Sequence, residues 1–182
     1  MKLHYLASAL ALVASVAACE KKPDTVASTV VTMHQIDSSG EQMEIGTITL
    51  ADTPDGLKLT PDLSHLTPGT HGFHVHENGS CDPGTKDGAT VAGLAAGGHL
   101  DPDHTGHHEG PTGTGHMGDL PALEVGVDGT ATTAVVAPRL KIADVWGHAL
   151  MIHQGGDNYA DSPAPLGGGG ARVACGIAPT AD

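Results

Sequence analysis

Residues 71–81 read HGFHVHENGSC, and the middle of this stretch alternates apolar and imidazole side chains. Successive side chains of a β-strand point to opposite faces, so His74 and His76 would project together from one face. Two imidazoles on a rigid strand can bind one metal ion. A lone H-x-H pair is a weak signal, and a metal site therefore requires further ligands from elsewhere in the chain.

Segments with the composition of β-strands lie on both sides of this stretch. They are rich in Val, Ile, Leu and Thr, and turn signals such as Pro54-Asp55-Gly56 and Asp128-Gly129 separate them. The second of these turns suits a tight hairpin. We therefore expect an all-β fold, an eight-stranded antiparallel Greek-key barrel or sandwich. Its predicted strands are residues 28–36, 43–50, 57–63, 72–77, 122–127, 131–137, 149–153 and 171–177.

Two long stretches, 78–121 and 154–170, interrupt this strand pattern. Loops of such length in a compact domain are usually functional or disordered. The chain has 13 histidines, and most of them lie from His71 to His116, so the first loop contains much of the cluster. We interpret both stretches as functional loops.

The charge of the chain restricts its partners. Eight Lys and Arg against 21 Asp and Glu give a formal net charge of −13. Without a basic stripe, the chain is not expected to bind nucleic acid through its phosphates. An anionic substrate would need local positive side chains to attract it.

Residues 1–18 have the pattern of a secretory signal peptide, and their apolar part is too short to span a bilayer. The junction Val16-Ala17-Ala18-Cys19 resembles a bacterial lipobox, which implies cleavage before Cys19 and lipid attached to it. The alternative is ordinary cleavage that leaves Cys19 free. Residues 19–27 would form a flexible tether, and 28–182 the folded domain. We expect a periplasmic or cell-envelope protein whose only membrane contact is the lipid, with Glu20 favouring the outer membrane.

The three cysteines fit this interpretation. If Cys19 carries lipid, Cys81 and Cys175 remain as one pair, and disulfides persist in exported proteins. A bridge across so long a loop would contribute roughly 4–5 kcal/mol in the chain-entropy model. The alternative is two buried free thiols.

Candidate metal ligands continue beyond the H-x-H pair. His99 lies in the run Gly97-Gly98-His99-Leu100-Asp101-Pro102, and His153 ends an apolar segment. An H-x-x-D pair stands later in the first long loop. Three histidines and one aspartate would make a four-coordinate site suited to zinc. The zinc candidates besides His99 are His108, His116 and Asp119.

Four motifs together resemble the copper/zinc superoxide dismutases in their bacterial exported form: HGFHVHENGSC, GGHLDP, GHMGDLP and GGGGARVACG. The resemblance covers nearly the whole chain after the tether. It implies one imidazole, that of His99, shared by both metals. The implied copper ligands are His74, His76, His99 and His153, and the implied zinc ligands are His99, His108, His116 and Asp119.

The resemblance also implies supporting residues. His107 adjoins His108, but the run Thr-Gly-x-His before Glu109-Gly110-Pro111 selects His108. Asp157 would join one copper and one zinc histidine by hydrogen bonds. Arg172 would hold an anion beside the copper, and Lys86 would add to the attractive field.

The implied function is disproportionation of superoxide to dioxygen and hydrogen peroxide, with His99 and Arg172 in catalytic roles. His99 would leave the copper on its reduction, take up a proton and deliver it when the copper is reoxidised. The alternative classes are a non-enzymatic copper or zinc buffer or delivery protein and a structural lipoprotein with incidental histidines. The family includes monomers and dimers, so a homodimer is compatible with the sequence, with Trp146 or Tyr159 as candidate contacts.

The remaining histidines are expected to be structural. His71 should form a backbone hydrogen bond or face solvent, and His104 and His107 should be solvated loop residues that at most capture metal weakly. Surface or packing positions are expected for His34, His65 and His148.

Overall fold

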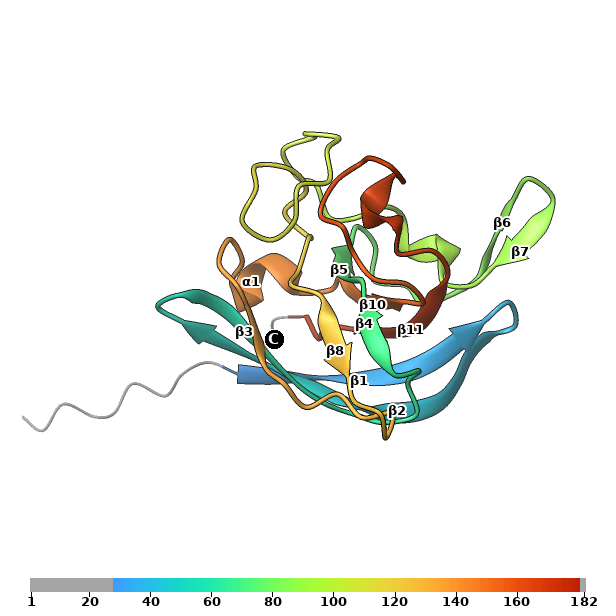
Figure 1. Cartoon of the computed structure of the whole chain (residues 1–182), viewed down its shortest axis with the longest axis horizontal. Coiled ribbons are helices and arrows are strands. Elements are labelled where there is room, and N and C mark those ends of the chain that lie inside the picture. The colour runs from blue at the N-terminus through green and yellow to red at the C-terminus, as the bar shows by residue number, and fades with distance from the viewer. Residues whose placement is uncertain (1–27, 181–182) are drawn as a thin grey trace, which may run out of the picture.

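The computed structural model describes residues 28–180, and most of its strands form one seven-stranded antiparallel sheet (Figure 1). The strand order is β5-β10-β11-β1-β2-β3-β9. These strands are β1 (Ser28–Asp37), β2 (Gly40–Thr53), β3 (Gly56–Leu63), β5 (Phe73–His76), β9 (Val135–Ala137), β10 (Ala149–His153) and β11 (Arg172–Ile177).

The connectivity is that of a Greek key. Strands β1, β2 and β3 follow one another as antiparallel hairpins, and β11 returns from the far end of the chain to pair with β1. The order of the strands in the sheet departs from their order in the chain, because long connections of the Greek-key type carry the chain from β3 to β5 and later back to β9 beside β3. The predicted all-β Greek-key class is therefore confirmed.

A two-stranded sheet of β4 (Gly69–His71) and β8 (Leu123–Val125) forms a second layer. Leu123 and Val125 point into the main core, where they meet aliphatic side chains from the large sheet. The chain has a single Phe, and it too is buried there. A core built from Val, Ile and Leu agrees with the low aromatic content.

The hairpin predicted around Asp128-Gly129 is wrong. The turn forms, with the Gly126 N–H donating to the Thr130 carbonyl at 2.8 Å, but its flanking strands do not pair with each other. Instead β8 pairs with β4, and β9 pairs with β3. Because β8 belongs to the two-stranded sheet and β9 to the seven-stranded sheet, the chain changes layers at this turn.

The first long loop contains structure that the sequence pattern did not indicate. Strands β6 (Gly84–Lys86) and β7 (Ala89–Val91) form a small hairpin, and the 3-10 turn η1 (Leu94–Ala96) follows. The predicted disulfide between Cys81 and Cys175 is confirmed, with both cysteines buried. It fastens the start of this loop to β11 in the middle of the sheet.

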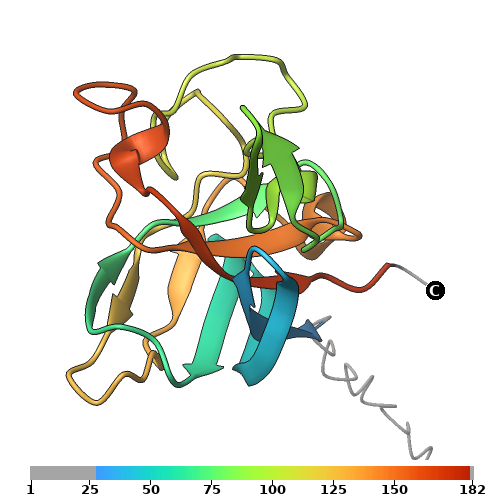
Figure 2. The same cartoon turned by 90° about the vertical axis from the view of Figure 1, so that its right-hand side faces the viewer.

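The two long loops lie at the same end of the barrel, where Figure 2 shows them rising side by side. The second loop includes the 3-10 turn η2 (Leu166–Gly168), and the short helix α1 (Ile142–Val145) precedes β10. Among the described residues, none of the helices has the length and apolar character needed to cross a membrane. The fold thus brings the histidine-bearing strand ends and both loops to one place.

Candidate metal centre

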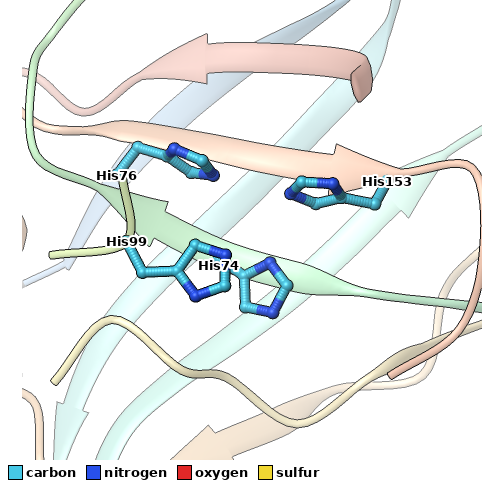
Figure 3. A group of neighbouring side chains, drawn as sticks. All are labelled: His74, His76, His99 and His153. Atoms are coloured by element: carbon cyan, nitrogen blue, oxygen red, sulfur yellow. The ribbon is translucent and has the colours of Figure 1, made fainter. Parts of the chain in front are cut away.

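Two neighbouring strands position the first group of histidines. His74 and His76 lie on β5, and β10 pairs with β5 so that Met151 is opposite His74, two residues before His153. A single β-bridge between His76 and His99 brings the first long loop against β5. One ligand atom from each residue lies within 4.8 Å of the others. Figure 3 shows the four converging rings, His74, His76, His99 and His153.

Each strand-borne histidine of this group has one ring nitrogen engaged and the other free. His74 Nε2 contacts an Asp157 carboxylate oxygen at 2.8 Å, His76 Nδ1 the Gly97 carbonyl at 3.0 Å, and His153 Nδ1 the Gly170 carbonyl at 3.2 Å. The opposite nitrogens are buried without a hydrogen-bond partner among residues 28–180. Buried polar atoms without partners cost free energy, and imidazole nitrogens are good copper ligands. The group therefore fits a copper ion that would bind these nitrogens.

A second group gathers around Asp119. Its Oδ1 lies 3.0 Å from His99 Nδ1, 2.9 Å from His108 Nδ1 and 3.6 Å from His116 Nδ1. The Nδ1 atoms of His108 and His116 are buried and have no hydrogen-bond partner among the described residues. Three imidazoles and one carboxylate, all buried, are a donor set suited to tetrahedral zinc. His99 belongs to both groups. Its Nδ1 lies beside Asp119, and its Nε2 remains available to the copper site.

His74 also comes near this second group. His74, His99, His108 and Asp119 have ligand atoms within 4.8 Å of one another, and His116 is not a member of this set. His74 has its free nitrogen, Nδ1, among the first group, and its Nε2 is occupied by Asp157. On donor chemistry we therefore keep His116 as the fourth zinc candidate.

Asp157 connects the two groups from the second long loop. Its two oxygens accept from His74 Nε2 and His108 Nε2, each at 2.8 Å, and the Tyr159 N–H donates to it at 2.7 Å. Gly167 leaves room for this carboxylate: it has φ +70°, and a Cβ there would lie 2.0 Å from Asp157 Oδ1. The glycine-rich segment is thus required for the loop to close over Asp157.

The shifted pKa values of the buried side chains favour cation binding at the site. Burial lowers the pKa of His74 to about 3 and that of His153 to about 4, so both rings are neutral and able to bind metal near neutral pH. Burial would also lower the pKa of His108, but the carboxylates of Asp119 and Asp157 outweigh it and raise this pKa to about 9. Burial raises the pKa of the Asp119 and Asp157 carboxyls, but hydrogen bonds from histidines outweigh burial and hold both pKa values well below the usual range.

A cavity of about 260 Å³ opens onto the first group. Three of the four histidines line it, and His74, which is fully buried, does not. Arg172 also lines the cavity, and its guanidinium donates to the carbonyls of Gly93 and, at 2.6 Å, Gly97. Leu166, 43% exposed, lies at the rim. A small anion entering this cavity would meet a fixed cation beside the metal-binding nitrogens.

Several predicted residues lie elsewhere. Lys86 is exposed on the β6–β7 hairpin and does not line the cavity. The His107 side chain is 71% exposed and 3.9 Å from Asp161, whereas its neighbour His108 is buried in the second group. His104 is also exposed. Cys19 lies outside the described residues.

His71 is buried, and its ring nitrogens contact the carbonyls of His153 at 2.6 Å and Thr67 at 2.7 Å. Of the two expectations for His71, the backbone hydrogen bond applies. The other three structural histidines, His34, His65 and His148, belong to neither metal group.

The sequence did not point to several residues that hold the loops in place. The Glu77 carboxylate accepts from the Gly98 N–H at 3.0 Å, next to His99. The Tyr159 hydroxyl accepts from the Ala122 N–H at 2.9 Å and so joins the ends of the two long loops. Such contacts to backbone groups depend on loop geometry, and residue type alone gives no signal for them.

Comparison with known proteins agrees with this geometry. Residues 44–178 match the family model described as copper/zinc superoxide dismutase. A Superoxide dismutase [Cu-Zn] of Escherichia coli K12 is 57% identical over 83% of this chain and 88% of its own length, and that of Brucella abortus is 51% identical over 97% and 99%. The solved Cu/Zn superoxide dismutase of Brucella abortus has a TM-score of 0.82 at 55% identity, covering 83% of this chain and 99% of its own. The monomeric copper, zinc enzyme from Salmonella enterica gives 0.75 at 58%, with the same coverage.

The first prediction concerns Asp157→Asn. An asparagine has one acceptor oxygen and one NH₂ group, so it cannot accept hydrogen bonds from both His74 and His108. One of the two rings loses its orienting partner, and affinity for at least one metal should fall about 10–100-fold. Competition with a chelator measures each affinity, and Asp55→Asn, an exposed turn substitution, is the charge-matched control. Unchanged affinity for both metals would refute the linking role of Asp157.

Proposed function

The chain belongs to the copper/zinc superoxide dismutase family, and we propose that the two histidine groups are the metal sites of its superoxide dismutase activity. The protein is an oxidoreductase whose cofactors are copper and zinc and whose substrate is superoxide. The observation that carries the site assignment is the set of five buried imidazole nitrogens without partners around one shared ring. In this assignment copper is bound by His74, His76, His99 and His153, and zinc by His99, His108, His116 and Asp119.

The two oxidation states of copper supply the electron transfer that converts two superoxide ions and two protons into one dioxygen and one hydrogen peroxide. The chain supplies geometry, attraction and protons. His99 is the proposed proton carrier, because its Nδ1 is held at Asp119 while its Nε2 remains for the copper side, next to the cavity. A proton held at His99 Nε2 would be delivered directly to a peroxide forming in the cavity.

Arg172 is the proposed anion-binding group. Its two hydrogen bonds to loop carbonyls fix the guanidinium in the cavity wall, so it needs no rearrangement when the substrate arrives. An open cavity with a fixed cation serves a reacting anion. A metal storage or delivery protein has no need of it, which argues against the non-enzymatic alternative. Lys86 would act only at longer range, from the exposed hairpin.

The copper assignment predicts the behaviour of His153→Ala. Removing this ligand should abolish tight copper binding and superoxide consumption together, while zinc stays bound, because His153 belongs only to the first group. Metal analysis and a superoxide assay on the same sample measure the effect, and His34→Ala, outside both groups, is the control. Stoichiometric copper or full activity in His153→Ala would contradict the assignment.

The role of Arg172 predicts a change in salt dependence. Replacing it by glutamate should lower the rate constant for superoxide about tenfold or more, since electrostatic steering is worth this much at charged clefts. The wild-type rate should fall with added salt, and the Arg172→Glu rate should fall less or rise. Rapid-kinetic measurements over a range of ionic strength test this, with Lys58→Glu as an exposed control of equal charge change. A rate that Arg172→Glu leaves unchanged would exclude the role.

We further propose that the protein is a lipid-anchored protein of the periplasm or cell envelope, on the outer membrane. The support is the order of residues 1–27: a signal-like segment, the lipobox-like junction before Cys19 and a polar tether. For a homodimer, the candidate contacts are Trp146 and Tyr159, which are 41% and 39% exposed.

The lipid proposal predicts the partitioning of Cys19→Ala. The full-length protein should be recovered with membranes and enter a detergent phase, and the variant should be released to the aqueous fraction with its activity retained. Mass measurement of the processed wild-type chain should show the mass of acyl groups at residue 19. An unmodified cysteine there, or aqueous recovery of the wild type, would disprove the anchor.

A further inference from the structure

The chain has two arginines, and both donate hydrogen bonds to loop carbonyls beside the metal groups. Arg172 donates to Gly93 and Gly97 on the copper side. Arg139 donates to three backbone carbonyls of the zinc-side loop, those of Gly113, Gly115 and His116. Its guanidinium nitrogen lies 2.9 Å from the Gly115 oxygen.

Arg139 is well placed to act as a fixed support. It follows β9 in the segment that leads to α1, between the buried side chains of Ala137 and Leu140. The Leu140 N–H also donates to the Ala137 carbonyl, which closes a turn around Arg139. The backbone at Arg139 is thus anchored in the core, while its planar fork of donors reaches outward to the loop.

The loop segment that Arg139 holds has few other attachments. Among the hydrogen bonds of the described residues, those of Gly113, Thr114 and His116 other than with Arg139 stay within the loop, to partners from His107 to Asp119. These bonds fix the shape of the loop, and just beyond the segment the Gly118 carbonyl accepts from the Val75 N–H of β5 at 2.9 Å. Among the described residues, Arg139 is the side chain from outside the loop that bonds directly to residues 113–116.

One of the three accepting carbonyls belongs to His116 itself, the proposed zinc ligand. The imidazole of His116 is buried with its Nδ1 free and 3.6 Å from Asp119. The position of the His116 ring depends on its own backbone, and the backbone is held by the guanidinium. Together with the Asp119 and His107 backbone bonds to His116, Arg139 therefore holds His116 at its distance from the other zinc candidates.

We infer that Arg139 is a positioning residue of the zinc site, which acts by fastening the backbone of residues 113–116 to the barrel. The inference rests on the proposed zinc site. By analogy with other groups that orient metal ligands, loss of Arg139 should lower zinc affinity about 10–100-fold. Lysine should not substitute, because one ammonium group cannot reproduce a planar fork that reaches three carbonyls.

Chemical rescue gives a readout that a general loss of stability would not produce. A cavity of about 400 Å³ lies beside the guanidinium and is lined by Arg139, Gly113, Thr114, Gly115, Met117 and Asp103. In Arg139→Ala this space should admit free guanidinium ion, which can donate to the same carbonyls. Guanidinium at concentrations far below those that unfold proteins should restore zinc affinity, and sodium chloride at equal ionic strength should not.

The experiment measures zinc affinity by chelator competition for the wild type, Arg139→Ala, Arg139→Lys and the control Lys58→Ala. We expect a loss in both Arg139 variants, rescue of Arg139→Ala by guanidinium, and wild-type affinity for Lys58→Ala, which changes an exposed side chain. Wild-type affinity in Arg139→Ala, or a loss that guanidinium does not reverse, would overturn the inference. If His116→Ala retains wild-type zinc affinity, the proposed zinc site itself is wrong, whatever the result for Arg139.

Discussion

The structure depends on one constraint: five imidazole nitrogens are buried at the end of the barrel with no hydrogen-bond partner in the part of the chain that the structure describes. Burying one unpaired polar group costs about 1–3 kcal/mol, so such a cluster is unfavourable unless cations bind it. The surrounding residues hold the rings in place despite this cost. They satisfy the opposite nitrogen of the strand-borne histidines and leave the free nitrogens directed at two points that share the His99 ring.

The two metal groups differ in how the fold holds their ligands. On the copper side, three ligands come from the paired strands β5 and β10, whose backbone is fixed by the sheet. On the zinc side, the ligands come from a loop, and side chains must replace the missing sheet hydrogen bonds. Asp157 ties the two sides together, the disulfide fastens the start of the loop, and Arg139 fastens the segment that carries His116. The zinc geometry is therefore more dependent on single side chains than the copper geometry is.

The fold class and the candidate ligands could be predicted because both leave periodic or motif-level signals. The H-x-H pair follows from strand alternation, and turn residues delimit most strands. The layer change at Asp128-Gly129 could not be predicted, because a turn sequence does not specify which partner each flanking strand chooses. Arg139 was missed for a related reason. Its partners are backbone carbonyls far along the chain, and every residue has a carbonyl, so no pattern distinguishes the three that it contacts.

The chain is acidic, yet it must attract an anionic substrate. This conflict is resolved by the different distances of its charges from the cavity. At physiological ionic strength charges separated by more than about 8 Å of solvent are largely screened from one another. The net charge of −13 is spread over the whole molecule, whereas Arg172 lines the cavity itself. Burial lowers the pKa of Arg172, but a guanidinium starts so far above neutrality that it remains charged. Its attraction acts within the poorly screened cavity, where one nearby cation outweighs many distant carboxylates. The charges of buried Asp119 and Asp157 would be offset by the metal cations that the contacting histidines bind.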